Sequence, residues 1–460
     1  MARCFCRWRR VLICICTPCI SLALLFVYVT VMLCMAMNNT SVPGIPVQDQ
    51  QGAHFVASGS FRNKSFAPLP KTFWDLHQQD AYWNRLQLTI DRHFNPILQA
   101  NNSMLRFKNS TFYESLVNRG FPEVTNLSSM KRNIEQLPQL LKDFASSMHR
   151  RDYPILIQPD GVCGVGAKDE TEPPLLLLAI KSTEMNFKNR QVIRQTWGQA
   201  GWVAGQKINS SEVGGRQGGF VRRVFLLATE NTEELGVDLN YLLEIESKQY
   251  GDILKWDFKD TFFNLTLKDV LFWKWFSHSC SRVRFVFKGD DDVFVHTPKI
   301  ITYLQDQLKT PQAYKTMKNF MVGNVIEAAI PIRVNTSKYF IPDSFYKGLY
   351  PSYPGGGGVV YSGLLAKRLY TMSKRVNLYP IDDVYVGMCM IRLNAHPIHH
   401  PAFLTFDFPD KEEEGRCSYH TVLLVHKRSP DQLVQLWAHL RETQEQCKDV
   451  PLRKDKEPKL

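Results

Sequence analysis

Three consecutive carboxylates, Asp290, Asp291 and Asp292, lie within the segment FVFKGDDDVFV, which spans residues 285–295. The aromatic and β-branched residues on both sides are typical of a buried strand. Like charges this close raise one another's pKa, and a divalent cation relieves that repulsion. The segment therefore predicts a metal site in which an Asp-x-Asp at the end of a strand directs two carboxylates at one ion. The alternative interpretation, a solvated acidic turn, fits the apolar flanks less well.

A second pair of carboxylates, Asp382 and Asp383, follows Pro380 and precedes residues 384–393, which have helical apolar spacing. Aspartate is favoured at a helix N-terminus because it caps free N–H groups and complements the helix dipole. Capping accounts for one of the two carboxylates. The other is free to act as a general base beside a bound substrate.

Basic residues cluster just after the first predicted strand, at Lys181, Arg190 and Arg194. On a helix the two arginines are four residues apart and face the same way. We expect these side chains to hold the base and phosphates of a nucleotide near the metal. The alternative is a set of solvated basic residues.

Four glycines, at residues 355–358, follow the aromatic segment YPSYP at residues 350–354. Glycine lets the backbone approach a ligand closely, and an aromatic ring can stack on a sugar. The predicted sugar pocket consists of Tyr353, Gly356, Gly357, Gly358 and Asp382. The alternative is a flexible linker, which seldom lies between aromatic and Val-Val-Tyr segments.

A last apolar run, residues 422–425, predicts a final buried strand that ends at His426. A single histidine is more often structural than functional. One at the end of a strand is nevertheless placed to contact a ligand.

Short apolar runs and helical segments alternate along the chain and predict the frame for these side chains. The predicted strands are residues 175–180, 224–228, 253–258 and 284–288, and the predicted helices include residues 189–198 and 265–276. This alternation predicts an α/β fold with a mostly parallel sheet and right-handed crossovers. Ligands bind beyond the carboxyl ends of such strands, and the three aspartates lie at one of these ends.

The 460-residue chain has room for a membrane anchor and a large folded domain. Residues 11–37 contain no charged side chain and are long enough to cross a hydrocarbon core of about 30 Å. Arginines in the tail at residues 1–10 precede this span, so the positive-inside rule keeps the N-terminus in the cytosol. We expect an uncleaved signal anchor of a single-pass type II membrane protein; a cleaved signal peptide is the alternative.

Beyond the anchor, composition divides the chain further. It predicts a stem at residues 38–70, an accessory segment at 71–170, an α/β domain at 171–445 and a tail at 446–460. A luminal position agrees with the Asn-x-Ser/Thr triplets that begin at Asn39, Asn63, Asn101, Asn109, Asn126, Asn209, Asn264 and Asn335.

The cysteines after the anchor also suit an oxidising compartment. They are Cys163, Cys280, Cys389, Cys417 and Cys447, enough for two disulfides and one free thiol. Their spacing does not determine the pairing, and Cys417 with Cys447 is a hypothesis only.

The net charge of +12 suits an anionic ligand such as a nucleotide diphosphate, although the basic residues are spread along the chain. A lysine-rich soluble surface would explain the same charge. Nucleic acid is not an expected partner, because the predicted anchor places the domain in the secretory lumen.

The chain resembles the β1,3-glycosyltransferases of the secretory pathway in an ordered set of segments: LLLLAIKS, RQVIRQTWG, FVFKGDDDVFV, YPSYPGGGGVVYSG, YPIDDVYVGMC and LLVHKR. The resemblance covers residues 71–445 and is strongest toward the β1,3-N-acetylglucosaminyltransferases that extend poly-N-acetyllactosamine chains. KGDDD and IDDV are typical of that branch, whereas galactosyltransferases of the family tend to have KTD and EDV at these places.

This resemblance implies a GT-A fold, a nucleotide-sugar-binding α/β sheet that uses Mn²⁺. It matches Asp290 and Asp292 to the Asp-x-Asp motif, with Asp292 as direct metal ligand and His426 as a second ligand. Asp383 matches the catalytic base. Donor contacts are implied at Lys181, Arg190, Arg194 and the three aspartates from Asp290 to Asp292.

The chain departs from the family near Cys163. Family members carry a cysteine shortly before this position, where this chain has His149, Arg150 and Arg151. The resemblance therefore gives no support for a disulfide at Cys163.

The implied activity is transfer of N-acetylglucosamine from UDP-N-acetylglucosamine, in β1,3 linkage, to a terminal galactose of a glycoprotein or glycolipid glycan at the Golgi membrane. An α-linked donor and a β-linked product require one inverting displacement, with Asp383 taking the proton of the galactose 3-hydroxyl. Two alternatives stay open: a β1,3-galactosyltransferase that uses UDP-galactose, and a non-catalytic luminal glycan-binding protein. The exact acceptor and the oligomeric state, including a homo-oligomer, are not determined by the sequence.

The predicted topology can be tested on intact vesicles. Protease added outside should spare nearly the whole chain, because only the tail at residues 1–10 is exposed. Endoglycosidase should lower the apparent mass on a denaturing gel, because the sequons lie in the lumen. Recovery of every molecule as a secreted protein that starts near Asn38 would instead establish a cleaved signal peptide.

Overall fold

The computed structural model describes residues 81–94, 137–160, 163, 173–205, 218–230, 239–409 and 411–455. The predicted anchor at residues 11–37, the stem at 38–70 and all sequons except Asn264 and Asn335 lie outside these ranges. Within the described ranges, no helix is both long and apolar enough to cross a membrane. Chain contacts separate residues 1–52 from residues 53–460, and all described residues belong to the second unit.

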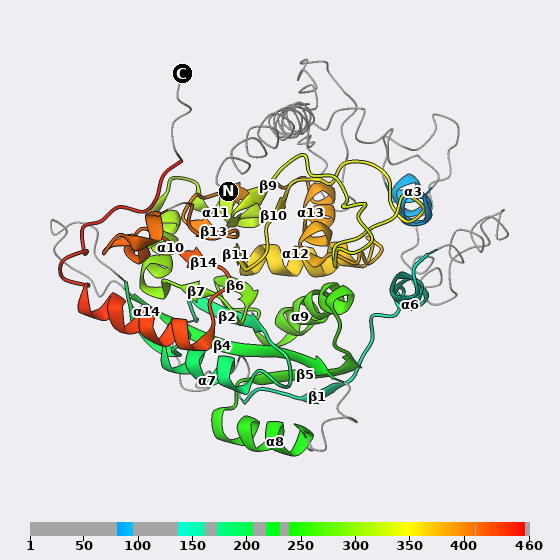
Figure 1. Cartoon of the computed structure of the whole chain (residues 1–460). Coiled ribbons are helices and arrows are strands. Elements are labelled where there is room, and N and C mark those ends of the chain that lie inside the picture. The colour runs from blue at the N-terminus through cyan, green and yellow to red at the C-terminus, as the bar shows by residue number, and fades with distance from the viewer. Residues whose placement is uncertain are drawn as a thin grey trace, which may run out of the picture. The chain divides into compact units, whose positions relative to one another are not determined.

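A nine-stranded sheet forms the centre of this unit, with the strand order β1-β5-β4-β2-β6-β11-β8-β12 and with β3 paired to β4 (Figure 1). The pairs β5–β4, β4–β2 and β2–β6 are parallel. The strands of this sheet are β1 (Ile155–Ile157), β2 (Leu176–Lys181), β3 (Gly201–Ala204), β4 (Gly218–Thr229), β5 (Ile253–Lys259), β6 (Phe285–Asp290), β8 (Met321–Gly323), β11 (Gly358–Ser362) and β12 (Ile398–His399).

Helices cover both faces of the sheet (Figure 1). Alternate side chains of β2 enter opposite cores, as strand geometry requires: Leu177 joins one buried cluster, and Leu176 and Leu178 join the other. The first core contains α9 (Leu265–Ser279), α12 (Gly363–Ser373) and α13 (Asp382–Arg392). The second contains α7 (Phe187–Gln195), α8 (Leu239–Tyr250), α10 (Thr297–Lys309) and α14 (Pro430–Glu442). A short helix, α11 (Ala313–Thr316), follows α10.

The predicted alternation of strands and helices is confirmed, but the prediction of a mostly parallel sheet is wrong for one half of it. Strand β11 runs antiparallel to both β6 and β8. Its first residue, Gly358, pairs with Gly289 near the carboxyl end of β6, so the chain has to run back along β6. The parallel half nevertheless ends where predicted, and the three aspartates lie at the carboxyl end of β6.

Two smaller sheets lie beyond this edge. One contains β13 (Phe403–Leu404), β14 (Leu424–Val425) and β7 (Phe294–Val295) in the order β13-β14-β7. The other pairs β9 (Val325–Ile326) with β10 (Tyr353–Pro354). Because β14 pairs antiparallel with β7, the chain that follows β14 is brought alongside the segment that precedes β7, which carries the three aspartates.

The described parts of the predicted accessory segment contribute to the first core. They include the helices α3 (Tyr82–Phe94) and α6 (Gln139–Ser147), and strand β1 of the same segment joins the central sheet. Trp83 of α3 is fully buried, and its indole N–H donates to the carbonyl of Leu378 at 3.0 Å. Leu141 of α6 is buried in the same cluster. In the described residues, the core is therefore continuous across the predicted boundary at residue 170.

Two disulfides connect the described cysteines. Cys417 bonds to Cys447, which confirms the hypothesis from the sequence. Cys163 bonds to Cys280, a disulfide for which the resemblance to the family gave no support. The partner of Cys163 is 117 residues further along the chain, whereas the cysteine that family members carry shortly before this position is absent here. Cys389 is the free, buried cysteine among the described residues.

A buried network of opposite charges joins α7, α8 and the start of β5. Arg190 pairs with Glu246 at 2.8 Å, and Arg194 pairs with both Glu246 and Asp252 at 2.7 Å. Arg223 of β4 also pairs with Asp252, at 2.7 Å. Asp252 is fully buried, and it compensates the charges of two guanidinium groups that are themselves largely buried.

Replacing Asp252 by alanine should destabilise the fold strongly. The change leaves Arg194 and Arg223 buried without their shared carboxylate, and breaking a buried pair in this way costs about 3–5 kcal/mol. Urea unfolding of the luminal domain measures the loss. The matched control is Lys188→Met, which breaks the exposed Lys188–Asp431 pair and should cost less than about 1 kcal/mol. Equal losses for the two variants would contradict a structural role for this network.

Candidate active site

A pocket of about 300 Å³ opens at the carboxyl ends of β2 and β6. The structure brings together here residues that are far apart in the sequence. Its lining includes Lys181, Ser182, Asp260, Phe262, Lys268, Lys288, the aspartates from Asp290 to Asp292, Tyr339, the glycines from Gly355 to Gly358, Asp382, Asp383 and His426.

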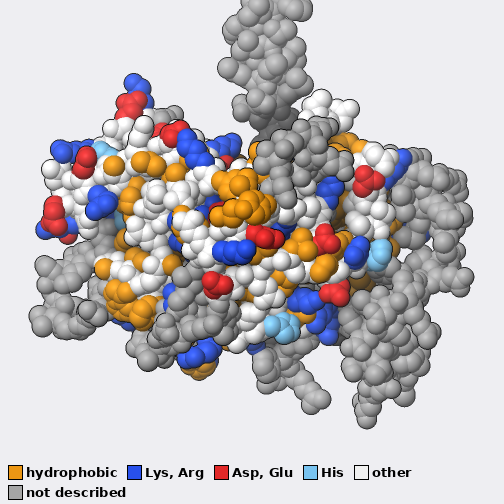
Figure 2. All heavy atoms as spheres, turned by 90° about the horizontal axis from the view of Figure 1, so that it is seen from below, with side chains coloured by type: hydrophobic (Ala, Val, Ile, Leu, Met, Phe, Trp, Pro, Cys, Tyr) orange, Lys and Arg blue, Asp and Glu red, His pale blue; other side chains and the backbone are white. Residues whose placement is uncertain are grey.

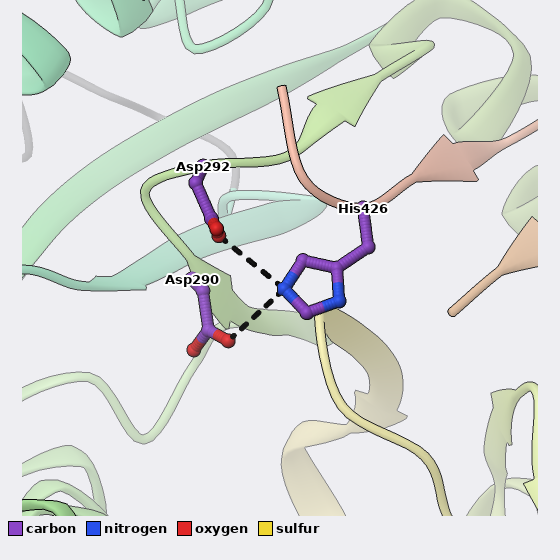
Figure 3. Close-up of side chains that lie close together, drawn as sticks. All are labelled: Asp290, Asp292 and His426. Atoms are coloured by element: carbon purple, nitrogen blue, oxygen red, sulfur yellow. Dashed lines mark ion pairs between the residues drawn. The ribbon is translucent and has the colours of Figure 1, made fainter. Parts of the chain in front are cut away.

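Asp290, Asp292 and His426 point toward one another at the mouth of the pocket (Figure 3). Nε2 of His426 lies 3.4 Å from an Asp292 oxygen and 3.8 Å from an Asp290 oxygen. One ligand atom from each residue lies within 4.8 Å of the other two, which is a spacing that a single cation can bridge. Asp290 ends β6, Asp292 follows two residues later, and His426 comes directly after β14.

Backbone and side-chain contacts fix the His426 ring. Its Nδ1 lies 3.2 Å from the carbonyl of Thr405, which leaves Nε2 directed at the two carboxylates. Gly357 has a φ of +92°, and a Cβ there would lie 2.9 Å from Cγ of His426. Burial lowers the pKa of His426, but the hydrogen bond and charge of Asp292 outweigh it and raise the pKa. The two carboxylates therefore favour positive charge beside Nε2 of His426.

Asp291 points away from this group and holds the loop after β2. Its carboxylate accepts hydrogen bonds from Ser182 Oγ at 2.6 Å and from Asn186 Nδ2 at 3.0 Å. Burial raises the pKa of Asp291 to about 6, against these two hydrogen bonds. Asp291 lines the pocket, but its carboxylate is engaged by the loop after β2, so its contact with a donor stays a prediction.

Asp382 lies beside two buried lysines. Lys181, at the end of β2, donates a short hydrogen bond to it, and Lys288 of β6 lies 3.8 Å away. Both lysines also contact Asp269, a fully buried residue of α9. Burial raises the pKa of Asp382, but the charges of Lys181 and Lys288 outweigh it and lower the pKa to about 2. Asp382 is consequently a fixed negative charge and a poor proton acceptor.

Asp383 behaves in the opposite way. It is partly exposed in the pocket, and in the described part of the chain it forms no ion pair. Burial and the charge of Asp382 raise the pKa of Asp383 to about 8. Of the two adjacent carboxylates, Asp383 is therefore the one with high proton affinity and access to a ligand.

Of the residues predicted for the sugar pocket, Gly356, Gly357, Gly358 and Asp382 line this pocket, and Tyr353 is not part of its lining. Gly356 approaches Asp383 so closely that a Cβ there would lie 3.1 Å from its carboxylate oxygen. Gly358 belongs to β11, where a Cβ would clash with Leu424 and Phe287. Tyr353 is half-buried on β10, and burial raises its pKa to about 12. The four glycines are therefore part of the ordered wall and are not a linker.

Arg190 and Arg194 do not reach this pocket, which corrects the expectation that they contact the nucleotide directly. Their guanidinium groups are buried in the ion pairs with Glu246 and Asp252. Arg190 also donates to the Ser182 hydroxyl at 3.2 Å, so it acts on the pocket only by supporting the loop after β2. Lys181 does line the pocket, but its ammonium group is engaged by Asp382.

Several residues of the site were missed by sequence reasoning. Asp269 lies in an amphipathic helix, where a single acid is usually solvated, and no local signal reveals that it is buried. Tyr339 and Phe262 line the pocket from distant loops, and their rings lie 5.2 Å apart, edge to face. Lys268 pairs with Asp260 at 2.7 Å beside them. Only the fold brings these residues together.

The basic residues do not form one continuous patch on the described surface that Figure 2 shows. Lysine and arginine side chains are interspersed there with acidic and apolar ones. On this face the distribution agrees with the interpretation of the positive charge as a solvated surface.

Known proteins similar to this chain share most of its length. The family model described as Galactosyltransferase matches residues 188–401. Human N-acetyllactosaminide β-1,3-N-acetylglucosaminyltransferase 2 is 41% identical over 381 residues, which cover 82% of this chain and 89% of that protein. Its mouse counterpart is 41% identical over 367 residues, covering 80% and 86%.

A third relative is the human acetylgalactosaminyl-O-glycosyl-glycoprotein β-1,3-N-acetylglucosaminyltransferase. It is 35% identical over 336 residues, which cover 71% of this chain and 81% of that protein. The resemblance that the sequence motifs indicated is thereby confirmed. The chain belongs to the galactosyltransferase family, in the group whose members are named β-1,3-N-acetylglucosaminyltransferases.

Proposed function

We propose that this protein transfers N-acetylglucosamine from UDP-N-acetylglucosamine, in β1,3 linkage, to a terminal galactose of a glycoprotein or glycolipid glycan. The proposal is supported mainly by the pocket. It holds the three candidate metal ligands, Asp290, Asp292 and His426, together with Asp383, an accessible carboxylate of high proton affinity. Curated relatives with matching names span most of the chain. We infer a GT-A fold, to which the mixed α/β architecture with its large central sheet is suited.

The donor atoms at the mouth of the pocket fit a divalent cation. Two carboxylates suit a hard ion, and an imidazole nitrogen suits a transition metal, so Mn²⁺ is compatible with both. Asp290, Asp292 and His426 would hold it. When bound, the ion would supply positive charge that stabilises the departing diphosphate.

Asp383 would serve as the general base. It is placed in the pocket, next to Gly356, and none of the described residues forms an ion pair with it. The acceptor 3-hydroxyl would donate its proton to this carboxylate as the oxygen attacks the anomeric carbon from the face opposite the diphosphate. This single displacement converts an α-linked donor into a β-linked product.

The residues around Asp383 would orient the two sugars. Tyr353 presents a half-buried ring, and Gly356 and Gly357 allow close backbone approach. Holding donor and acceptor in line can supply a large share of the rate, since effective molarities of oriented reactants reach about 10⁵–10⁸ M. The stem and anchor predicted from the sequence would place this domain in the Golgi lumen.

A β1,3-galactosyltransferase is the second candidate, because the matching family model carries the description Galactosyltransferase. A non-catalytic glycan-binding protein would not require a base. Incubating the luminal domain with a panel of UDP-sugars and galactose-terminated acceptors distinguishes the three. Transfer from UDP-N-acetylglucosamine supports the proposal, transfer from UDP-galactose supports the second candidate, and binding without transfer supports the third.

Loss of a charged ligand from the candidate metal site should abolish transfer. Asp292→Asn loses a negative charge that a neutral amide does not replace, so Mn²⁺-dependent binding of UDP should weaken along with activity. His426→Ala should act in the same direction, more mildly, because a neutral ligand is lost. Calorimetry of UDP binding with and without Mn²⁺ measures the effect. Full transfer activity in excess chelator would contradict the role of both residues.

The two adjacent aspartates should respond differently to isosteric amides. Asp383→Asn should lower kcat by about 10²–10⁴, the usual contribution of a general base, with donor Kd little changed. Asp382→Asn should reduce kcat by disturbing Lys181 and Lys288, and it should leave a measurable rate. A near-normal kcat for Asp383→Asn with an inactive, folded Asp382→Asn would reassign the base to Asp382.

The pH dependence follows from the same assignment. A base must be deprotonated to act, so kcat/KM should rise with pH through the pKa of Asp383, which is about 8 in the metal-free protein. A bound cation lowers that pKa, and the acid limb should therefore lie below about pH 8. The limb should disappear from the residual rate of Asp383→Asn.

A further inference from the structure

Asp269 is a carboxylate in the middle of the first core. It lies on α9, is fully buried, and is four residues from the helix start. An isolated ionised carboxylate at such a depth is highly unfavourable, so it needs positive partners. Its partners are Lys181, at 3.5 Å, and Lys288, which donates a hydrogen bond to its other oxygen.

The same two lysines reach Asp382 from the other side. Lys181 donates to Asp382, and Lys288 lies 3.8 Å from it. Two lysines and two aspartates thus form one closed group, contributed by β2, β6, α9 and α13, with side-chain exposures between 0% and 10%. The charges balance only while all four residues are present.

Packing makes this group rigid. Thr266 of α9 donates a hydrogen bond to the carbonyl of Tyr379 at 2.6 Å, just before α13. The rings of Trp273 and Tyr385 stack between α9 and α13 at 6.3 Å. The first turn of α13, which carries both Asp382 and Asp383, is consequently held against α9 by apolar contacts and against the sheet by charge.

We propose that Asp269 is a positioning residue: it holds the ammonium groups of Lys181 and Lys288 in place, and through them it fixes Asp382 and directs its neighbour Asp383 into the pocket. The proposal rests on the function proposed above, in which Asp383 accepts the acceptor's proton. Asp269 itself does not line the pocket. Its effect on the reaction is therefore transmitted entirely through the two lysines.

The primary test is Asp269→Asn in the complete luminal domain. The amide keeps the shape of the side chain and removes its charge, so two lysines then share one carboxylate. We expect kcat to fall by about 10- to 100-fold, the effect of a small misplacement of a catalytic group, with the Kd for UDP in Mn²⁺ changed less than about threefold. Rates are compared per folded molecule, with the folded fraction measured by circular dichroism.

The matched control is Asp91→Asn. Asp91 is also a buried carboxylate paired with a cation of α13: Arg392, at the opposite end of the same helix, donates to it at 2.9 and 2.6 Å. Its loss should lower the melting temperature in the same way, because Arg392 is left without its buried carboxylate. Since it lies away from the pocket, kcat should stay within about twofold of wild type.

A charge-balanced double variant separates positioning from simple structural damage. Lys288→Met combined with Asp269→Asn removes one charge of each sign and keeps the Lys181–Asp382 contact. We expect kcat of the double variant to recover several-fold relative to Asp269→Asn. If Asp269 contributed only stability, kcat per folded molecule would already be normal in Asp269→Asn, and the second change would have no loss of kcat to restore. The two residues are in direct contact, so their effects on stability are expected to be coupled in either case and do not decide the point.

Each outcome decides the proposal. A selective fall in kcat for Asp269→Asn, with recovery in the double variant and no fall in Asp91→Asn, supports it. A normal kcat per folded molecule in Asp269→Asn overturns it, and so does equal loss of kcat in Asp91→Asn. If Asp269→Asn does not fold, failure of the double variant to exceed the activity of Lys288→Met alone overturns it. A normal kcat in Asp383→Asn would instead remove the proposed function on which this inference rests.

Discussion

The structure around the candidate site depends on the charge balance of four buried side chains, two lysines and two aspartates. Lys181 ends β2, and Lys288 lies two residues before the end of the neighbouring strand β6, on the same side of the sheet. Each lysine is buried and would be unfavourable there without a carboxylate. Asp269 and Asp382 supply those carboxylates from two different helices. Because neither helix can move away without exposing an unpaired charge, the position of α13 relative to β2 and β6 is determined by electrostatics as well as by packing.

This arrangement also explains how two adjacent aspartates differ in chemistry. Asp382 faces the lysines and stays ionised, whereas Asp383 faces the pocket and has no cation paired with it in the described residues. The negative charge of Asp382 then raises the proton affinity of its neighbour. Two adjacent acids at a helix N-terminus can thus have different roles, one as a structural anion and the other as a candidate base. The difference arises because the lysines of the sheet contact only the first of them.

The mouth of the pocket depends on a different interaction, the pairing of β14 with β7. That pairing brings His426 to the two carboxylates of the Asp-x-Asp, although more than 130 residues separate them in the sequence. The backbone N–H of Arg428 donates to the carbonyl of Asp292 at 2.6 Å and tightens the same junction. Gly357 fits beneath the imidazole because it has no Cβ. The candidate metal ligands and the candidate base are therefore held by separate parts of the fold that meet at the end of β6.

Local patterns in the sequence were enough to locate the strands, the acidic ends and the terminal histidine, because apolar periodicity and charges at strand ends are local properties. The same patterns suggested that Arg190 and Arg194 bind a nucleotide. The local sequence of an arginine pair on a helix is the same whether the pair faces a ligand or buried acids. They also suggested a mostly parallel sheet. The antiparallel direction of β11 was not predictable, because it depends on where the preceding loop places the start of that strand. Only the tertiary structure decided these points. It paired Cys163 with Cys280, enclosed the two arginines with Glu246 and Asp252, and buried Asp269 beneath the site, because each of these contacts joins residues whose separation along the chain carries no local signal.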